Sequence, residues 1–160
     1  MNTAYLCLGG NIGNTQAIFK KAIEQIESGI GRCVFKSRLY ATEPWGFEAK
    51  QLFLNQVVAV ATELEPHAIL EQCLLIEAEL GRTRSGNGYQ PRTIDIDILF
   101  IDNQIIDFPD LKIPHPLLHL RNFVLQPMCD IAPKFVHPVL KKTMAELRDE
   151  SPDEGRCEVL

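Results

Sequence analysis

Alternating hydrophobic and polar positions give the clearest structural pattern of the chain between Ile94 and Ile101. This segment reads Ile-Asp-Ile-Asp-Ile-Leu-Phe-Ile and predicts a β-strand, in which successive side chains point to opposite faces of the sheet. Asp95 and Asp97 then share one face, and the isoleucines between and beside them share the other. The strand is therefore expected to turn its isoleucines toward a core and two carboxylates to the opposite side.

The rest of the pattern alternates between strands and helices. One helix is expected from the cap Asn14 to about Ser28, and a second from Pro66 to Leu80, because apolar residues recur there at helical spacing. Strands are expected over residues 4–8, 33–40, 52–61 and 104–107, and two more helices over 119–129 and 143–148.

This order, β-α-β-β-α-β, predicts an α+β fold of the ferredoxin-like kind, with two helices on one face of an antiparallel sheet. The C-terminal helices form an appended segment. We expect residues 1–160 to make a single domain whose polar tail, residues 151–160, frays.

Composition narrows the classes of partner. A net charge of −5 argues against nonspecific binding to nucleic acid or to an anionic membrane, and no apolar run approaches spanning length. The first residues lack the basic stretch of a signal peptide. Five scattered cysteines indicate reduced thiols in a cytoplasm, not a disulfide framework or a zinc site. We expect a cytoplasmic monomer acting on small molecules.

The paired carboxylates of Asp95 and Asp97 repel each other unless a cation sits beside them. Arg82, Arg84 and Arg92 lie just before them, in a stretch without acidic residues. Hard-cation ligands next to arginines suggest a metal-bound polyphosphate. An exposed Asp-x-Asp strand can also be merely solvated, so the arginines carry this hypothesis.

The glycine-rich turn from Gly9 to Asn14 is not a P-loop, since no Gly-Lys-Ser/Thr follows it. A triphosphate would therefore be held by arginine side chains, which are planar bidentate donors. His115, between two prolines, fits an ordinary turn histidine as well as a phosphate contact.

Aromatic residues and an amide suggest a flat ligand with polar edges. Trp45 stands in a loop rich in proline and glycine, Phe53 and Asn55 share one strand face, and Phe123 follows on a helix. Rings can stack on a heterocycle while an amide pairs with its edge. Taken alone, Phe53 and Phe123 fit a core better than a ligand contact.

These residues give the chain a resemblance to a known family, 6-hydroxymethyl-7,8-dihydropterin pyrophosphokinase, up to about Met144. The resemblance rests on these blocks: Gly9-x-Asn11, Tyr40-x-Thr42-x-Pro44-x-Gly46-Phe47, Phe53-x-Asn55, Glu77-x-x-x-Gly81-Arg82-x-Arg84, Pro91-Arg92-Thr93-Ile94-Asp95-Ile96-Asp97, Ile113-Pro114-His115-Pro116 and Arg121-x-Phe123-Val124-Leu125. The sequence departs from the family pattern at Gly10, Tyr89, Gln90, Asp110, Leu117 and Leu120.

The resemblance implies a folate-pathway enzyme that transfers pyrophosphate from ATP to the pterin alcohol and releases AMP. It further implies two Mg²⁺ ions on Asp95 and Asp97, with ATP as the co-substrate. Catalytic roles would fall to Arg82, Arg92, Asp95 and Asp97; pterin contacts to Thr42, Trp45, Phe53, Asn55 and Phe123; and ATP contacts to Glu77, Arg82, Arg84, Arg92, His115 and Arg121. The rival from another class is a non-catalytic ferredoxin-like module that binds a nucleotide or another ligand.

Overall fold

The computed structural model describes residues 1–10, 14–42, 53–81 and 94–160, and the predicted mixture of helices with an antiparallel sheet is confirmed. The described elements are, in chain order, β1 (Asn2–Gly10), α1 (Thr15–Gly29), β2 (Gly31–Lys36), β3 (Tyr40–Thr42), β4 (Phe53–Thr62), α2 (Pro66–Leu80), β5 (Asp95–Ile101), β6 (Ile106–Phe108), β7 (Leu111–Ile113), a 3-10 turn (Leu118–Leu120), α3 (Asn122–Ile131), α4 (Met144–Glu150) and β8 (Cys157–Val159).

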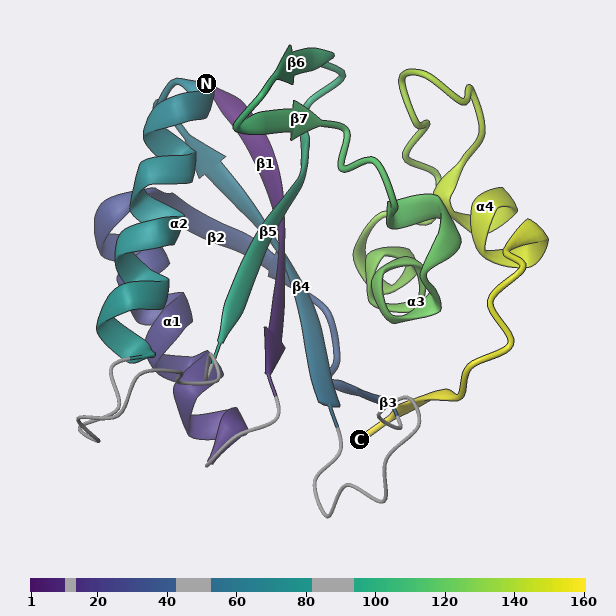
Figure 1. The fold of residues 1–160 in the computed structure, drawn as a ribbon, viewed down its shortest axis with the longest axis horizontal. Coiled ribbons are helices and arrows are strands. Elements are labelled where there is room, and N and C mark those ends of the chain that lie inside the picture. The colour runs from purple at the N-terminus through teal and green to yellow at the C-terminus, as the bar shows by residue number, and fades with distance from the viewer. Residues whose placement is uncertain (11–13, 43–52, 82–93) are drawn as a thin grey trace.

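One antiparallel sheet organises the molecule, with strand order β5-β1-β4-β3-β8 and with β2 also paired to β4. Helices α1 and α2 cover one face of this sheet, and α3 and α4 lie on the other (Figure 1). The small β6–β7 hairpin lies at the end of the sheet away from the start of β4 (Figure 1). None of the described helices is both long and apolar enough to cross a membrane.

The two predicted N-terminal helices are confirmed, and their first residues explain where they begin. The Asn14 side chain accepts the N–H of Ala17 at 3.3 Å, and Pro66 opens α2. Each helix buries one apolar stripe against the sheet, formed by Phe19, Ala22 and Ile26 on α1 and by Ile69, Cys73 and Ile76 on α2.

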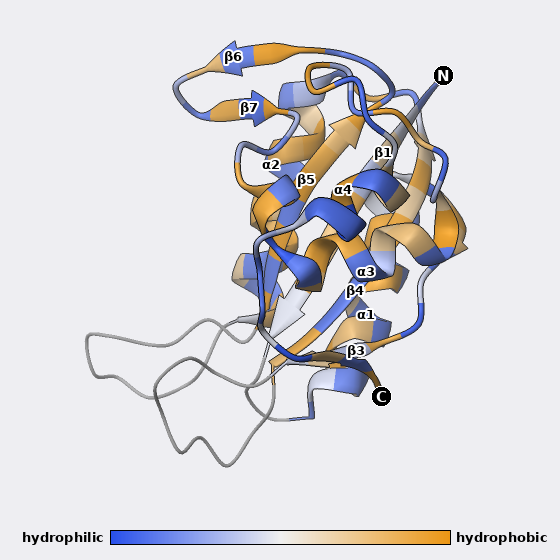
Figure 2. Ribbon diagram, turned by 90° about the vertical axis from the view of Figure 1, so that its right-hand side faces the viewer, coloured by the Kyte–Doolittle hydropathy of each residue, from blue (hydrophilic) through white to orange (hydrophobic). Residues whose placement is uncertain are grey.

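The isoleucines of β5 lie in this same core, as the alternation predicts: Ile94, Ile96 and Ile98 are buried, whereas Asp95 and Asp97 are exposed. A register shift where β5 pairs with β1 then places both Leu99 and Phe100 in a second core under α3 and α4. Figure 2 views the molecule from the side of α3 and α4, and most of the α4 ribbon there has the colour of hydrophilic residues.

The prediction of one continuous strand over residues 33–40 is wrong, because the chain forms two strands, β2 and β3, with a break that begins at Ser37. There the Ser37 hydroxyl, not a backbone carbonyl, accepts the N–H of Val57 at 2.9 Å. The N–H of the next residue, Arg38, turns away to Asp130 on α3 at 3.0 Å. The Ser37 N–H still donates to the Val57 carbonyl at 2.8 Å, but side chains replace the backbone partners of the two neighbouring N–H groups.

The C-terminal expectations also need correction. The tail does not fray along its whole length, because β8 pairs with β3 and the N–H of Leu160 donates to the carbonyl of Leu39 at 2.9 Å. The helix expected over 119–129 is preceded by the 3-10 turn and begins only at Asn122. The last helix matches its expectation closely, since Thr143 forms a capping box with Glu146.

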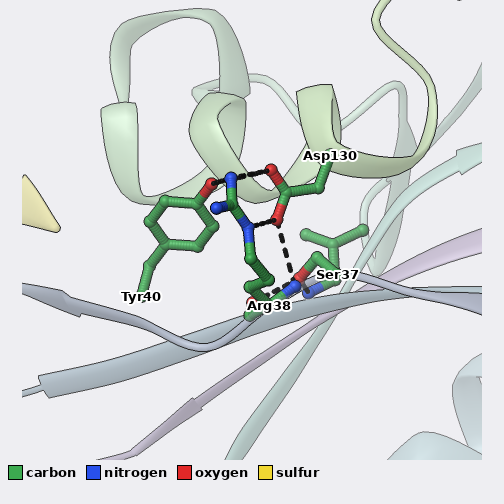
Figure 3. A network of polar contacts seen from close by, with 5 residues as sticks. Ser37, Arg38, Tyr40 and Asp130 are labelled. Atoms are coloured by element: carbon green, nitrogen blue, oxygen red, sulfur yellow. Dashed lines mark hydrogen bonds and ion pairs between the residues drawn. The ribbon is translucent and has the colours of Figure 1, made fainter. Parts of the chain in front are cut away.

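Asp130 ties β3 to α3 through a compact polar network (Figure 3). Its carboxylate accepts two side-chain N–H groups of Arg38, at 3.0 and 2.9 Å, and the hydroxyl of Tyr40 at 2.7 Å. Burial alone would raise the pKa of Asp130, but these donors hold that pKa below its usual value. The network fixes the strand from which Thr42 projects.

We expect Asp130→Asn to lower the Tm at neutral pH by about 2–4 °C, the shift expected for losing roughly one hydrogen bond in a domain of this size. A carboxylate with a depressed pKa stabilises the fold above its unfolded pKa of about 3.9, and this contribution is lost as the pH falls further. Thermal unfolding from pH 7 to pH 3 should therefore show the two proteins converging below about pH 4. A constant difference, or one as small as that of the exposed Asp149→Asn, would contradict this role.

Candidate functional site

A row of side chains crosses four strands at one end of the sheet. Asp95 of β5 pairs with Gly9 of β1, Gly9 with Asn55 of β4, and Asn55 with Tyr40 of β3. These positions share the face covered by α3. Since neighbouring strands lie about 4.8 Å apart, the backbones at Asp95 and Asn55 are roughly 10 Å from each other.

The adjoining positions extend this face in both directions. Asp97 pairs with Cys7, which pairs with Val57, so the second carboxylate lies beside a buried apolar surface. At the open end, Thr42 of β3 pairs with Phe53 of β4. Phe53 and Asn55 were expected to share one strand face. This is confirmed, because both residues belong to β4 and lie two positions apart in it.

Asn55 is 6% exposed, and it lies close to Gly9. A Cβ at position 9 would come within 3.0 Å of the Asn55 Nδ2, tighter than ordinary van der Waals contact. Glycine at this strand position leaves room for the Asn55 amide to lie across it. Asn55 is therefore a buried polar group beside a glycine, at the end of the sheet that carries Asp95.

Cys7 lies between the carboxylates and Asn55, yet it is no candidate nucleophile. Burial, and next the Asp97 carboxylate, raise the pKa of its thiol well above the ordinary value. Because only the thiolate is nucleophilic, Cys7 is expected to act as a packing residue.

His115 lies close enough to Asp97 and to Arg121 for both charges to act on its imidazole. Burial lowers the pKa of His115, the charge of Arg121 lowers it further, and the charge of Asp97 opposes both. The His115 Nδ1 accepts the N–H of Leu117 at 3.2 Å. A neutral imidazole then carries its proton on Nε2, an N–H that can donate to an anionic ligand.

Arg121 and Phe123 flank the start of α3 and line a pocket of about 560 Å³ together with Leu120, Pro152 and Asp153. The Arg121 guanidinium lies over the Phe123 ring, with 5.4 Å between its central carbon and the ring centroid. Phe123 also packs at the margin of the second core. The structure therefore gives Phe123 both a core contact and a pocket surface.

Glu77 makes a contact that the sequence did not reveal. Its Oε2 accepts the backbone N–H of Ile96 at 2.8 Å, between the two aspartates. Because the described sheet continues from β5 only toward β1, this N–H lies on the outer edge of the sheet. Glu77 thus fixes the backbone that carries both carboxylates.

We expect Glu77→Ala to raise the Mg²⁺ concentration needed for half-maximal turnover by about tenfold, because losing this charge-assisted hydrogen bond loosens the strand between the carboxylates. Glu77→Gln keeps an acceptor oxygen and should lie between the alanine variant and the wild type. Glu79→Ala, an exposed change on the same helix, is the control. A Mg²⁺ titration with equal midpoints for the Glu77→Ala and Glu79→Ala variants would contradict this role.

Four of the predicted site residues lie outside the described residues: Trp45, Arg82, Arg84 and Arg92. Described residues bordering those segments, including Thr42, Phe53 and Ile94, lie at the end of the sheet that carries Asp95 and Asn55. Asp110, one of the departures from the family pattern, instead binds His67 at 3.1 Å beside the β6–β7 hairpin.

The described residues contain no group of three or more His, Cys, Asp or Glu side chains that could hold a metal ion. Two carboxylates alone suit Mg²⁺, which keeps waters and binds through one or two carboxylates together with substrate phosphates. Three residues that line the pocket, Leu120, Pro152 and Asp153, were not predicted from the sequence, because packing between distant segments brings them together and they carry no motif.

Comparisons with known proteins agree on one family. The model of the family 7,8-dihydro-6-hydroxymethylpterin-pyrophosphokinase (HPPK) matches residues 5–133. A 2-amino-4-hydroxy-6-hydroxymethyldihydropteridine pyrophosphokinase of Porphyromonas gingivalis is 45% identical, covering 86% of this chain and 95% of its own length. A protein of the same name from Aquifex aeolicus is 36% identical and covers 100% of this chain and 99% of its own length.

Solved structures show the same fold at low identity. The wild-type HPPK-DHPS of Plasmodium falciparum matches 93% of this chain with a TM-score of 0.75 and 19% identity. An HPPK-DHPS structure in complex with substrates matches 92% with a TM-score of 0.72 and 18% identity. The chain spans less than half of those longer proteins, 44% and 43% respectively.

Proposed function

Because the chain belongs to the 7,8-dihydro-6-hydroxymethylpterin-pyrophosphokinase family, we propose that the side chains at its sheet edge carry out the family's reaction. In this reaction ATP gives its β,γ-pyrophosphoryl group to the hydroxymethyl oxygen of 6-hydroxymethyl-7,8-dihydropterin in folate biosynthesis, and AMP leaves. The single observation that carries the assignment is the strand pairing that puts Asp95, Asp97 and the buried Asn55 on one face.

Asp95 and Asp97 would hold two Mg²⁺ ions between the protein and the phosphates of ATP. Their fit is supported by exposure of both carboxylates on a paired strand and by the contact that Glu77 makes between them. When bound, Mg²⁺ would neutralise phosphate charge and lower the pKa of the attacking hydroxyl. The rigid strand would keep the carboxylates in place, so that little reorganisation is needed as the reaction proceeds.

The pterin would lie over the open end of β3 and β4. Asn55 would pair with the polar edge of the heterocycle, and Phe53 and Phe123 would stack on its faces. Phe53 is 39% exposed, which supports a ring that is available to a ligand. Thr42, its neighbour across the strands, and Trp45 would complete the pocket.

The nucleotide would lie on the other side of the carboxylates. The Nε2–H of His115 and the guanidinium of Arg121 would donate to phosphate oxygens. Arg82 and Arg92 would clamp the transferring group and offset its developing charge, and Arg84 would add a nucleotide contact. Glu77 would act at the same end of the site, in addition to fixing β5.

The arrangement of strands and cores also bears on the type of fold and on the number of domains. The order in which β5, β1 and β4 pair, with α1 and α2 on one face of these strands, supports a ferredoxin-like arrangement. The two cores lie on opposite faces of one shared sheet, which supports a single domain.

Five free cysteines favour a reducing cytoplasm as the location of the protein. Helices of the chain itself cover both sheet faces, which favours a monomer. The acidic balance disfavours nucleic acid as a partner.

The rival function, a non-catalytic ligand-binding module, is not favoured, since relatives at 36–45% identity are named as pyrophosphokinases. The deciding experiment measures AMP release from ATP with the pterin alcohol. We expect release that requires both the pterin and Mg²⁺ and that stops in excess chelator. A chain that binds both ligands without releasing AMP would support the rival function.

A further inference from the structure

The start of α3 lacks a cap of its own. Arg121, at the N-cap position, makes no side-chain hydrogen bond to the first turn. The N–H of Asn122 is taken instead by the Asp153 Oδ2 at 2.9 Å, and the Asn122 Nδ2 donates to the Asp153 carbonyl at 2.8 Å. These two bonds join the C-terminal tail to the turn that carries Arg121 and Phe123.

Asp153 is itself held in one orientation. Its second carboxylate oxygen, Oδ1, accepts the N–H of Gly155 at 2.8 Å, and its own N–H donates to the hydroxyl of Ser151 at 3.2 Å. Both carboxylate oxygens are therefore engaged. A side chain fixed by its own segment can transmit the position of that segment to α3.

The other end of the tail is fixed to the opposite wall of the site. In β8, Cys157 pairs with Thr42 and Val159 pairs with Tyr40. Thr42 in turn pairs with Phe53. Residues 151–160 therefore connect the helix turn carrying Phe123 to the strands carrying Thr42 and Phe53.

The tail also lines the pocket, since Pro152 and Asp153 form its wall with Leu120, Arg121 and Phe123. The family match ends at residue 133, so residues 134–160 lie beyond the matched segment.

Resting on the proposed function, we propose that Asp153 is a positioning residue that, through Asn122, holds the neighbouring Phe123 ring in the position from which it would stack on the pterin. The span between two aromatic rings sets how well a flat heterocycle stacks between them, so a small displacement weakens binding. Asp153 acts on pterin affinity through Phe123 and makes no direct contribution to phosphate chemistry.

The first test measures KM for the pterin, KM for ATP, and kcat in Asp153→Ala, with Glu154→Ala as the matched control. Glu154 is the next residue, is exposed, and carries the same charge. We expect Asp153→Ala to raise the pterin KM about tenfold, the effect of one charge-assisted hydrogen bond, and to change the KM for ATP by no more than about twofold. Asp153→Asn keeps one acceptor oxygen and should restore part of the pterin KM.

A purely structural role would move both KM values with the Tm, and would overturn the proposal. Equal pterin KM values for the Asp153→Ala and Glu154→Ala variants would overturn it too. Should Asp153→Ala not fold, the Asp153→Asn variant carries the same comparison. If the wild type releases no AMP, the proposed function fails first; an active wild type with a normal Asp153→Ala variant refutes only the inference about Asp153.

The second test asks whether Asp153 acts through Phe123. Pterin dissociation constants are measured for Asp153→Ala, for Phe123→Leu and for the double variant. If Asp153 only positions the ring, its replacement should weaken binding by no more than about twofold in the Phe123→Leu background. A full, independent tenfold effect in both backgrounds would mean that Asp153 contributes by another route.

Discussion

Asp97→Ala is expected to lower turnover by at least about 10²-fold, the usual cost of losing one strong electrostatic stabiliser at a reacting centre. Asp97 lies on β5, on the same face of the sheet as Asp95, Cys7 and Asn55. Removing one of two like charges relieves repulsion when no cation is bound. The fold should therefore survive the substitution, and the Tm without ligands should not fall.

The measurement is AMP release at saturating ATP and pterin over a range of Mg²⁺ concentrations, with thermal unfolding alongside. Asp107→Ala is the matched control, since it changes an exposed aspartate on β6, away from the site. A variant at position 97 that melts much earlier, yet turns over at the wild-type rate when folded, would mean that the carboxylate pair is structural.

Asn55→Ala is expected to weaken pterin binding by about 10- to 100-fold while leaving the affinity for ATP nearly unchanged. A site built to pair with the polar edge of a ligand leaves the ligand's groups unmatched when one partner is deleted, at roughly 1–3 kcal/mol. The amide is 6% exposed, so water compensates only in part for its loss.

Calorimetric titrations of both ligands separate these outcomes. Asn103→Ala, an exposed change in the turn after β5, is the control. Equal losses for pterin and ATP would place Asn55 in a structural role or at the nucleotide. No change in either affinity would remove it from the site.

Local patterns were enough to predict much of this arrangement. Alternation along β5 identified its two faces, and the cap at Asn14 and the proline at position 66 marked where the first two helices begin. These features depend on residues within one turn or one strand of each other. The site residues that share a strand, Asp95 with Asp97 and Phe53 with Asn55, follow from the same two-residue period.

What the sequence could not reveal depends on contacts between distant segments. The break between β2 and β3 follows from the contacts of Ser37 with Val57 and of Arg38 with Asp130. The tail was expected to fray because its composition is polar, but its pairing with β3 decides its structure. The hydrogen bond from Ile96 to Glu77 likewise joins two elements with no shared motif.

The central claim is that the carboxylates and the amide on this face direct a pyrophosphoryl group from ATP to the pterin. The most direct test uses ATP radiolabelled at the β-phosphorus, in a single turnover with the pterin alcohol and Mg²⁺. We expect the label to move to the pterin, with one unlabelled AMP formed for each labelled pterin diphosphate. A label that stays in ADP, or that leaves as free pyrophosphate without the pterin, would contradict the claim.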